Sequence, residues 1–242
     1  LSPDKEILAA GSEKEIVFLE LKSMKVLQRL KSQLVYERKV GKVAREFAGI
    51  CSVAFSPDGA ILVAGGNGLE FWDLKAGQLS KKIDLHEEDE FVSFSPDGRT
   101  LVSSSRKRIT FWEVNTQKVD KVLFDDSAWI KAQTFSPCGK FLAYAGDDKV
   151  VTIVDAENKQ IVQKLDCPTA VNAIQFNHDG SKLVIGCFKE VMVWDVQSWK
   201  HLDSFKGDWL VYAIAFNERN ELMICAKGPD YVMNLWNVTK SK

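Results

Sequence analysis

Phe55-Ser56-Pro57-Asp58-Gly59 is the stretch that decides the fold, because variants of it return along the chain. In each copy an aromatic residue precedes Ser-Pro-Asp-Gly or a related tetrapeptide. The copies begin at Phe55, Phe94, Phe135, Phe176 and Phe216, so they are almost evenly spaced. A period of about 40 residues predicts an array of similar structural units.

A second mark follows each aromatic at a nearly constant distance along the chain. It is Trp-Asp or a variant, at Trp72-Asp73, Trp112-Glu113, Val154-Asp155, Trp194-Asp195 and Trp236-Asn237. The segments between the marks are short, apolar and rich in β-branched residues, which strands favour. Ser-Pro-Asp-Gly itself is turn chemistry, because proline presets φ and glycine accepts positive φ. We therefore expect four short strands in each repeat.

The two marks, kept in phase over five copies, resemble the WD40-repeat family, and the resemblance covers essentially the whole chain. It implies an all-β fold, a WD40-type β-propeller in which each repeat forms one blade. We expect six visible blades, of which the first lacks its inner strand and the last lacks its outer strand. A seven-bladed ring of which these six are a part is the alternative.

The predicted domain organisation is a single WD40 propeller domain over residues 1–242, or a fragment of one. Leu1-Ser2-Pro3-Asp4 matches the repeated turn, so we expect the chain to be a fragment of a longer protein. The blade units are expected at 1–30, 50–84, 90–124, 130–165, 170–205 and 210–238, with an inserted loop at 31–49.

The repeats depart from the family in the polar groups that typically join the strands of a blade. Typical blades carry Gly-His before the inner strand and Asp between the second and third strands, which form a buried hydrogen-bond network with Ser or Thr and the Trp. Gly-His pairs are missing here, and the turn Asp is kept only at Asp148 and Asp230. We therefore expect blades held mainly by apolar packing.

Composition is that of an ordinary globular protein, with 45% hydrophobic residues, 27% charged residues and a net charge of −1. A net charge so near zero exerts no general attraction on nucleic acid or an anionic membrane. The five cysteines are widely spaced without a C-x-x-C pair, which predicts neither disulfides nor a zinc site. We expect an intracellular protein, cytoplasmic with the nucleus as the alternative, and no membrane insertion.

Catalytic chemistry is not indicated. The three histidines, His86, His178 and His201, fall in different repeats and different kinds of loop. No phosphate-binding glycine motif and no G-x-S-x-G motif occurs in the sequence. We predict no catalytic residue, no metal site, no cofactor and no enzymatic activity.

Two groups of basic residues are candidates for partner binding, because loops carry function on repeat scaffolds. One group lies in the insertion at 31–49. The other lies in a predicted turn of the blade unit at 90–124. The candidates are Arg38, Lys39, Lys42 and Arg45 in the insertion, and Arg106, Lys107 and Arg108 in the turn.

Trp129 and Trp209 form a third candidate group, because both precede predicted inner strands. Tryptophan at such a position can anchor a partner peptide. It can equally pack between blades as part of the core. By contrast, we expect the tryptophans of the second mark to be structural.

The predicted function is a non-catalytic protein–protein interaction scaffold or sensor domain that binds through its loop-rich face. Its partners would be proteins of a larger assembly or other domains of the same chain. The alternative is a nucleic-acid-binding propeller that uses the basic loops, for which a steep dependence of affinity on salt is expected.

Overall fold

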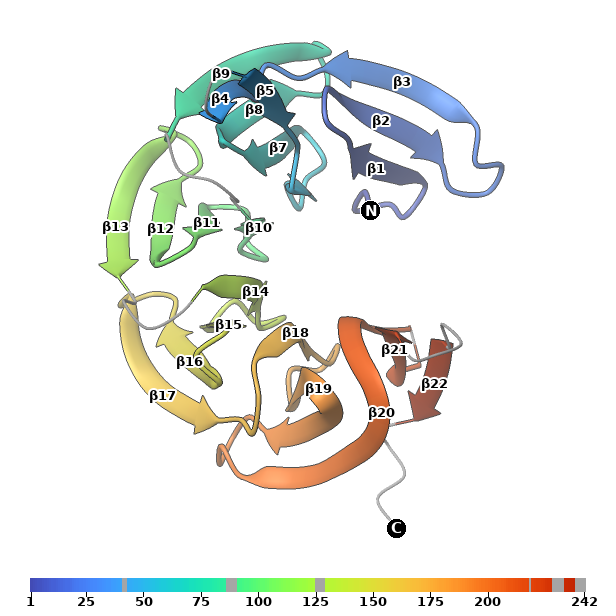
Figure 1. The fold of residues 1–242 in the computed structure, drawn as a ribbon, viewed down its shortest axis with the longest axis vertical. Helices are drawn as coiled ribbons and strands as arrows, with labels where there is room; N and C mark the ends of the chain where they lie inside the picture. Colours follow the sequence, from blue (N-terminus) through green and yellow to red (C-terminus); the bar gives the residue numbers. More distant parts are fainter. Residues whose placement is uncertain (41–42, 86–90, 125–128, 218, 228–232, 238–242) are drawn as a thin grey trace. The chain divides into compact units, whose positions relative to one another are not determined.

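The computed structural model describes residues 1–40, 43–85, 91–124, 129–217, 219–227 and 233–237. For 35–40, 43–48, 208–209, 227 and 233–237 the description covers the backbone alone. All regular secondary structure in these ranges is β-strand (Figure 1). The chain divides into two compact units, Leu1–Phe124 and Asp125–Lys242. The prediction of one domain over the whole chain stays a prediction.

The first unit contains three propeller sheets, each an antiparallel meander. The first sheet has the three strands β1 (Ile7–Gly11), β2 (Glu15–Glu20) and β3 (Val26–Lys31). The second is built from β6 (Ser52–Phe55), β7 (Ile61–Gly66), β8 (Gly68–Asp73) and β9 (Gln78–Asp84). The third is built from β10 (Phe91–Phe94), β11 (Thr100–Ser105), β12 (Arg108–Glu113) and β13 (Lys118–Phe124).

The insertion that we expected as a loop forms a two-stranded antiparallel hairpin in the same unit. Its strands are β4 (Val35–Val40) and β5 (Val43–Ala48), and they pair from Val35 with Ala48 to Val40 with Val43. Lys42 lies outside the described residues. The hairpin is a separate sheet and extends none of the three meanders.

The second unit contains two propeller sheets. One has four strands, β14 (Ile130–Phe135), β15 (Phe141–Gly146), β16 (Val150–Asp155) and β17 (Gln160–Asp166). The other has five strands, β18 (Val171–Phe176), β19 (Lys182–Asp195), β20 (His201–Phe216), β21 (Glu221–Lys227) and β22 (Met233–Asn237).

The prediction of six blades, alone or within a ring of seven, is wrong for the described residues, which form five propeller sheets. The outer strand of the fifth repeat and the inner strand of the sixth are one continuous strand, β20. Leu210 is the joint, because it pairs with Phe188 on β19 and with Lys227 on β21. No proline interrupts β20, so the extended backbone continues where the repeat pattern predicts a break.

The repeated tetrapeptide closes the link between the first and second strands of a sheet. Ser56 is buried; its Oγ donates to Asp58 Oδ1 (2.6 Å) and accepts from the Ile61 amide (2.9 Å). Gly59 has a φ of 71°, a backbone conformation that glycine adopts without strain. Ser95 and Asp97 repeat these contacts in the third sheet. The turn thus satisfies its own polar groups while it is partly buried.

Apolar packing joins neighbouring sheets within each unit, because alternate residues of a strand point to opposite faces. In the second sheet Leu62 and Trp72 pack toward the first sheet, in a cluster with Phe18. Val63 and Phe71 pack toward the third sheet, in a cluster with Trp112. Trp72 and Trp112 are buried, as expected for structural residues, while the Trp236 side chain lies outside the description.

Candidate functional site

Trp129 lies at the surface of the second unit, immediately before β14, and is 44% exposed. Its backbone is held in place, because its carbonyl accepts from the Asp147 amide (3.2 Å) in the turn between β15 and β16. A Cβ on Gly146 would stand 1.8 Å from that carbonyl oxygen, so only glycine lets the two segments approach. Lys131 forms an ion pair with Asp147 (2.5 Å) in the same part of the unit.

Phe188 is a second exposed aromatic residue at the corresponding end of the neighbouring sheet, and sequence reasoning did not select it. It lies in β19 and is 47% exposed. Thr169 Oγ1 accepts from the Phe188 amide (3.0 Å) and fixes the backbone, while Lys189 Nζ lies 5.5 Å from the ring centroid. The signal was present, since Phe188 occupies the position at which typical blades carry the turn Asp.

Trp129 and Phe188 therefore belong to one edge of the second unit. Ile130 pairs with Gly146 and Val171 pairs with Cys187, so both residues stand beside the first ladder position of their sheets. The inner strands of these sheets, β14 and β18, lie side by side. The other predicted tryptophan, Trp209, lies in β20, and its side chain is outside the described residues.

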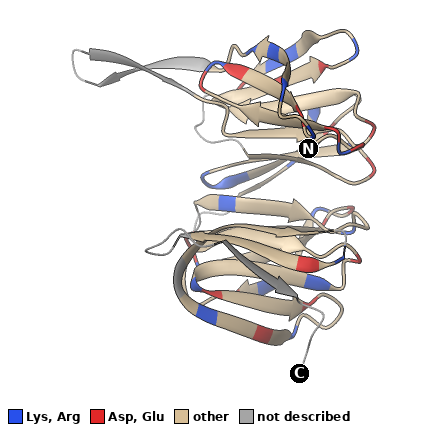
Figure 2. Ribbon diagram, turned by 90° about the vertical axis from the view of Figure 1, so that its right-hand side faces the viewer, with Lys and Arg blue, Asp and Glu red and all other residues tan. Residues whose placement is uncertain are grey.

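The basic candidates all belong to the first unit. Arg106 and Lys107 are exposed in the turn between β11 and β12, and the half-buried Arg108 opens β12 opposite Ser105. Arg38 and Lys39 lie in β4 and Arg45 in β5, with Arg38 opposite Arg45. The side chains of these three hairpin residues are not described. Basic and acidic residues are interspersed along the described segments of each unit (Figure 2), without a single-sign stripe.

Both ends of the β4–β5 hairpin are fixed to the first unit by contacts that sequence reasoning missed. Before the hairpin, the Gln33 amide donates to Glu70 Oε1 (2.5 Å), and Leu34 is buried in the core. After it, the Cys51 amide donates to the Gly65 carbonyl (2.8 Å). Glu70 is fully buried in β8 and also accepts from Trp72 Nε1 (3.2 Å). A buried carboxylate in mid-strand thus connects the insertion to the blade.

Comparison with known proteins identifies the family. The model of the anaphase-promoting complex subunit 4 WD40 domain matches residues 100–179, and that of the WD domain, G-beta repeat, matches residues 41–73 and 78–113. The chain belongs to the WD40-repeat family.

Similar curated proteins are WD-repeat proteins of three kinds. The small ribosomal subunit protein RACK1 of Caenorhabditis elegans is 26% identical over 86% of this WD40 chain and 67% of its own length. Protein HIR1 of Candida albicans is 27% identical over 48% of the chain and 15% of its own length. A subunit of chromatin assembly factor 1 from Mus musculus is 22% identical over 50% of the chain and 26% of its own length. The chain therefore spans a small part of two of these relatives.

Two buried thiols are among the potential metal ligands in the described part of this WD40 chain. Its His, Cys, Asp and Glu residues form no group of three that could hold a metal ion. Cys167 and Cys187 are free and lie buried in one apolar cluster, and their mutual hydrogen bond raises the pKa of Cys167. No helix in these ranges is long and apolar enough to cross a bilayer.

The two histidines that are described pack against aromatic rings. His178 lies against Phe216 and His201 against Trp194, while His86 lies outside the described residues. Both imidazole rings thus form edge-to-face contacts with an aromatic neighbour.

Proposed function

We propose that this WD40 chain is a non-catalytic scaffold that captures a protein segment on the edge formed by Trp129 and Phe188. The observation that carries the proposal is the pair of exposed aromatic rings on neighbouring sheets, each on a backbone fixed by hydrogen bonds. Rigid aromatic side chains are frequent hot spots of protein interfaces, because they bury a large area at low entropic cost.

A larger assembly is the setting that we propose for this scaffold. One matching protein is named as a subunit of chromatin assembly factor 1, and one matching family model is named for a subunit of the anaphase-promoting complex. The small ribosomal subunit protein RACK1 is named as part of a particle as well. We propose an intracellular location, cytoplasmic with the nucleus as the alternative, because the described cysteines are free thiols.

The test is affinity purification of the full-length protein from its native source, with mass spectrometry at low and high salt. We expect a discrete set of proteins that survives high salt and is lost in Trp129→Ala and in Phe188→Ala. Ile161→Ala is the matched control, because Ile161 is similarly exposed on β17 of the same unit. Unchanged recovery in both aromatic variants would overturn the proposal.

Nucleic-acid binding through the basic groups is the competing outcome of the same experiment. It predicts co-purified RNA or DNA that is released by high salt and is reduced in an Arg106→Ala/Lys107→Ala variant. The net charge of −1 and the interspersed charges argue against it. Release of all partners by nuclease would favour it over the scaffold.

A further inference from the structure

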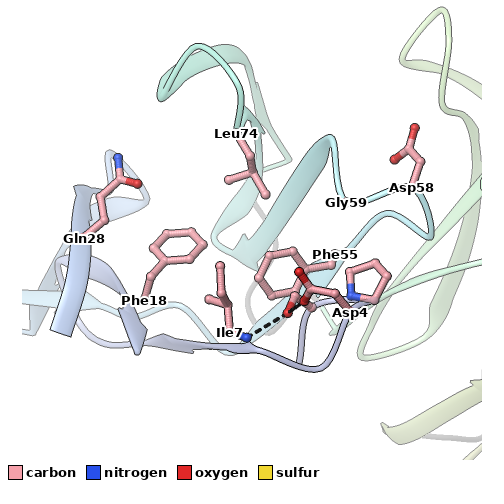
Figure 3. A pocket seen from close by; sticks show the side chains of 10 residues that line it. Asp4, Ile7, Phe18, Gln28, Phe55, Asp58, Gly59 and Leu74 are labelled. Atoms are coloured by element: carbon pink, nitrogen blue, oxygen red, sulfur yellow. Dashed lines mark hydrogen bonds between the residues drawn. The ribbon is translucent and has the colours of Figure 1, made fainter. Parts of the chain in front are cut away.

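A cavity of about 360 Å³ opens between the first and second sheets of the first unit (Figure 3). On one side its walls come from β1, β2, β3 and the turn before β1. On the other side they come from the end of β6, the turn after it and Leu74, which follows β8. A volume of this size is in the range of ligand sites, which begin at roughly 300 Å³. It is larger than a single side chain requires.

The floor of the cavity is apolar and partly aromatic. Ile7, Phe18, Phe55 and Leu74 point into it (Figure 3). Phe18 and Phe55 meet edge to face with their centroids 6.1 Å apart, so the two sheets are in contact beneath the opening. Ile7, Phe55 and Leu74 are only half-buried, which leaves apolar surface for a ligand to cover.

The rim carries two carboxylates, those of Asp4 and Asp58, and the residues that line the cavity include no cation. In each, Oδ1 is engaged by its own turn, through Ser2 and Glu6 for Asp4 and through Ser56 and Ala60 for Asp58. In the described residues no hydrogen bond or ion pair occupies Oδ2 of either. Hydroxyl donation from Ser2 and Ser56 lowers the pKa of both groups, so both are ionised at neutral pH.

The next groove of the same unit, between the second and third sheets, has the same turns but a different character. It is lined by Asp58 and Asp97, yet Arg99 stands on its rim with Nε 4.0 Å from Asp97 Oδ2. Its apolar lining, Ile61 and Val114, contains no aromatic ring. An aromatic floor below two uncompensated carboxylates thus distinguishes the first groove from the second.

We propose that the first groove binds a peptide segment of a partner protein in which a large apolar side chain is followed by lysine or arginine. The apolar side chain would cover the exposed parts of Ile7, Phe55 and Leu74, where each buried methylene contributes favourably. The cation would approach the free oxygens of Asp4 and Asp58, where exposed pairs orient a ligand more than they hold it. Gln28 lies at the other end of the opening and offers its amide to the peptide backbone (Figure 3).

The experiment is fluorescence anisotropy of the chain 1–242 with four labelled, end-capped peptides that differ in two central residues. The central pairs are Leu-Lys, Leu-Gln, Leu-Glu and Ser-Lys. We expect Leu-Lys to bind most tightly, Leu-Gln about tenfold more weakly, and Leu-Glu and Ser-Lys not measurably. Equal binding of Ser-Lys and Leu-Lys would overturn the proposal, because it would show attraction to acid alone.

Variants distinguish a loss of peptide binding in the groove from a loss of folding. Asn keeps the turn bonds of an Asp, so Asp4→Asn/Asp58→Asn should weaken Leu-Lys about tenfold and leave Leu-Gln unchanged. Asp97→Asn is the matched control from the next groove and should have no effect. Gln28→Trp, at an exposed strand position, should block the opening and abolish binding. Binding that survives Gln28→Trp would overturn the proposal.

A second copy of the chain is the other occupant that the design detects. Self-association of the native chain that is lost in Gln28→Trp, together with no binding of Leu-Lys, would assign the groove to a copy and overturn the peptide proposal. The lining of the groove includes neither Trp129 nor Phe188. Variants of these two residues should leave Leu-Lys binding unchanged.

Discussion

The second and third sheets each bury a tryptophan at the same position of the repeat, but the indole N–H donates to a different kind of acceptor in each. In the second sheet Trp72 Nε1 donates to Glu70 Oε2 (3.2 Å) on the same strand. In the third sheet Trp112 Nε1 donates to Ser103 Oγ (3.0 Å) on the neighbouring strand. Because buried N–H groups are costly when unpaired, each sheet needs an acceptor, but the fold does not dictate where it stands.

The pairing of the second and third strands in each sheet explains why the acceptors differ. Ala64 stands opposite Glu70 in the second sheet, and Ser103 stands opposite Thr110 in the third. A small apolar residue on one strand leaves room for a long carboxylate on the other. Glu70 also accepts from the Gln33 amide, which ties the β4–β5 hairpin to the sheet. The Ser103 hydroxyl thus contacts only its own blade. Glu70 contacts its own blade and also the segment before the insertion.

The fifth sheet has a third arrangement of the same position. Met192 and Ile185 take the places that Glu70 and Ser103 hold relative to their tryptophans, and neither offers an acceptor. In the described residues, the buried Trp194 Nε1 has no hydrogen-bond partner. Apolar packing around Trp194 thus holds a blade without the polar contact.

Removal of the whole indole gives the largest expected effect. Trp72→Ala and Trp112→Ala should each lower the free energy of unfolding by about 3–5 kcal/mol, because each leaves a large cavity in a packed core. The two losses should be similar, since both side chains are buried between sheets. Urea unfolding followed by far-UV circular dichroism measures them. A loss below about 1 kcal/mol at either site would contradict the assigned packing.

Removal of the acceptor should have a larger effect in the second sheet than in the third. We expect Glu70→Ala to cost about 2–3 kcal/mol, because it leaves Trp72 Nε1 and the Gln33 amide unpaired, and Ser103→Ala to cost about 1 kcal/mol. Hydrogen exchange of the Gln33 amide should accelerate only in Glu70→Ala. Equal exchange in the two variants would show that Glu70 does not hold the base of the hairpin.

An exchange of residues sharpens this comparison. The double variant Ala64→Ser/Glu70→Thr transfers the pair of the third sheet into the second. It should recover about 1 kcal/mol relative to Glu70→Ala, because Trp72 regains an acceptor. Gln33 exchange should stay fast, since no carboxylate reaches it.

The smallest expected effect concerns the Ser-Pro-Asp-Gly turns, which have the same hydrogen bonds in the second and third sheets. Hydroxyl donation from Ser95, followed by the Arg99 amide, lowers the pKa of Asp97, and Ser56 and Ala60 do the same for Asp58. A carboxyl group with a lowered folded-state pKa stabilises above its unfolded pKa and loses that contribution as pH falls through the folded value.

Asp58→Asn and Asp97→Asn should therefore lower the melting temperature slightly and equally at pH 7. The difference from the native chain should shrink below about pH 4, near the pKa of a free aspartate. Melting curves between pH 7 and pH 3 test this. A difference that grows toward pH 3 would contradict the proposed role of the ionised carboxylates.

Much of the architecture was predictable from local chemistry. The Phe-Ser-Pro-Asp-Gly turn and the Trp-Asp mark placed the strands of the repeats, because turn conformation and strand preference act over a few residues. Trp72 and Trp112 were correctly expected in the core. The six-blade prediction failed at β20, where the pattern of two repeats continues but one continuous strand pairs with β19 over its first part and with β21 over its second.

The candidate sites were less accessible to sequence reasoning. Trp129 was selected with core and surface readings both open, and its 44% exposure places it at the surface. Phe188 and Glu70 were missed, because a phenylalanine or a glutamate within a strand pattern says little about exposure or burial. Whether Trp129 binds a partner stays a prediction.

By itself, the sequence determined the class of fold, the spacing of the strands and the chemistry of the turns, because these depend on short-range backbone preferences that every repeat restates. Tertiary structure alone decided which strands share a sheet, which acceptor meets each buried indole, and that Ile7, Phe18, Phe55 and Leu74 leave a groove open. These features depend on the neighbours that each side chain meets across a sheet or between sheets, and such neighbours are distant in the sequence.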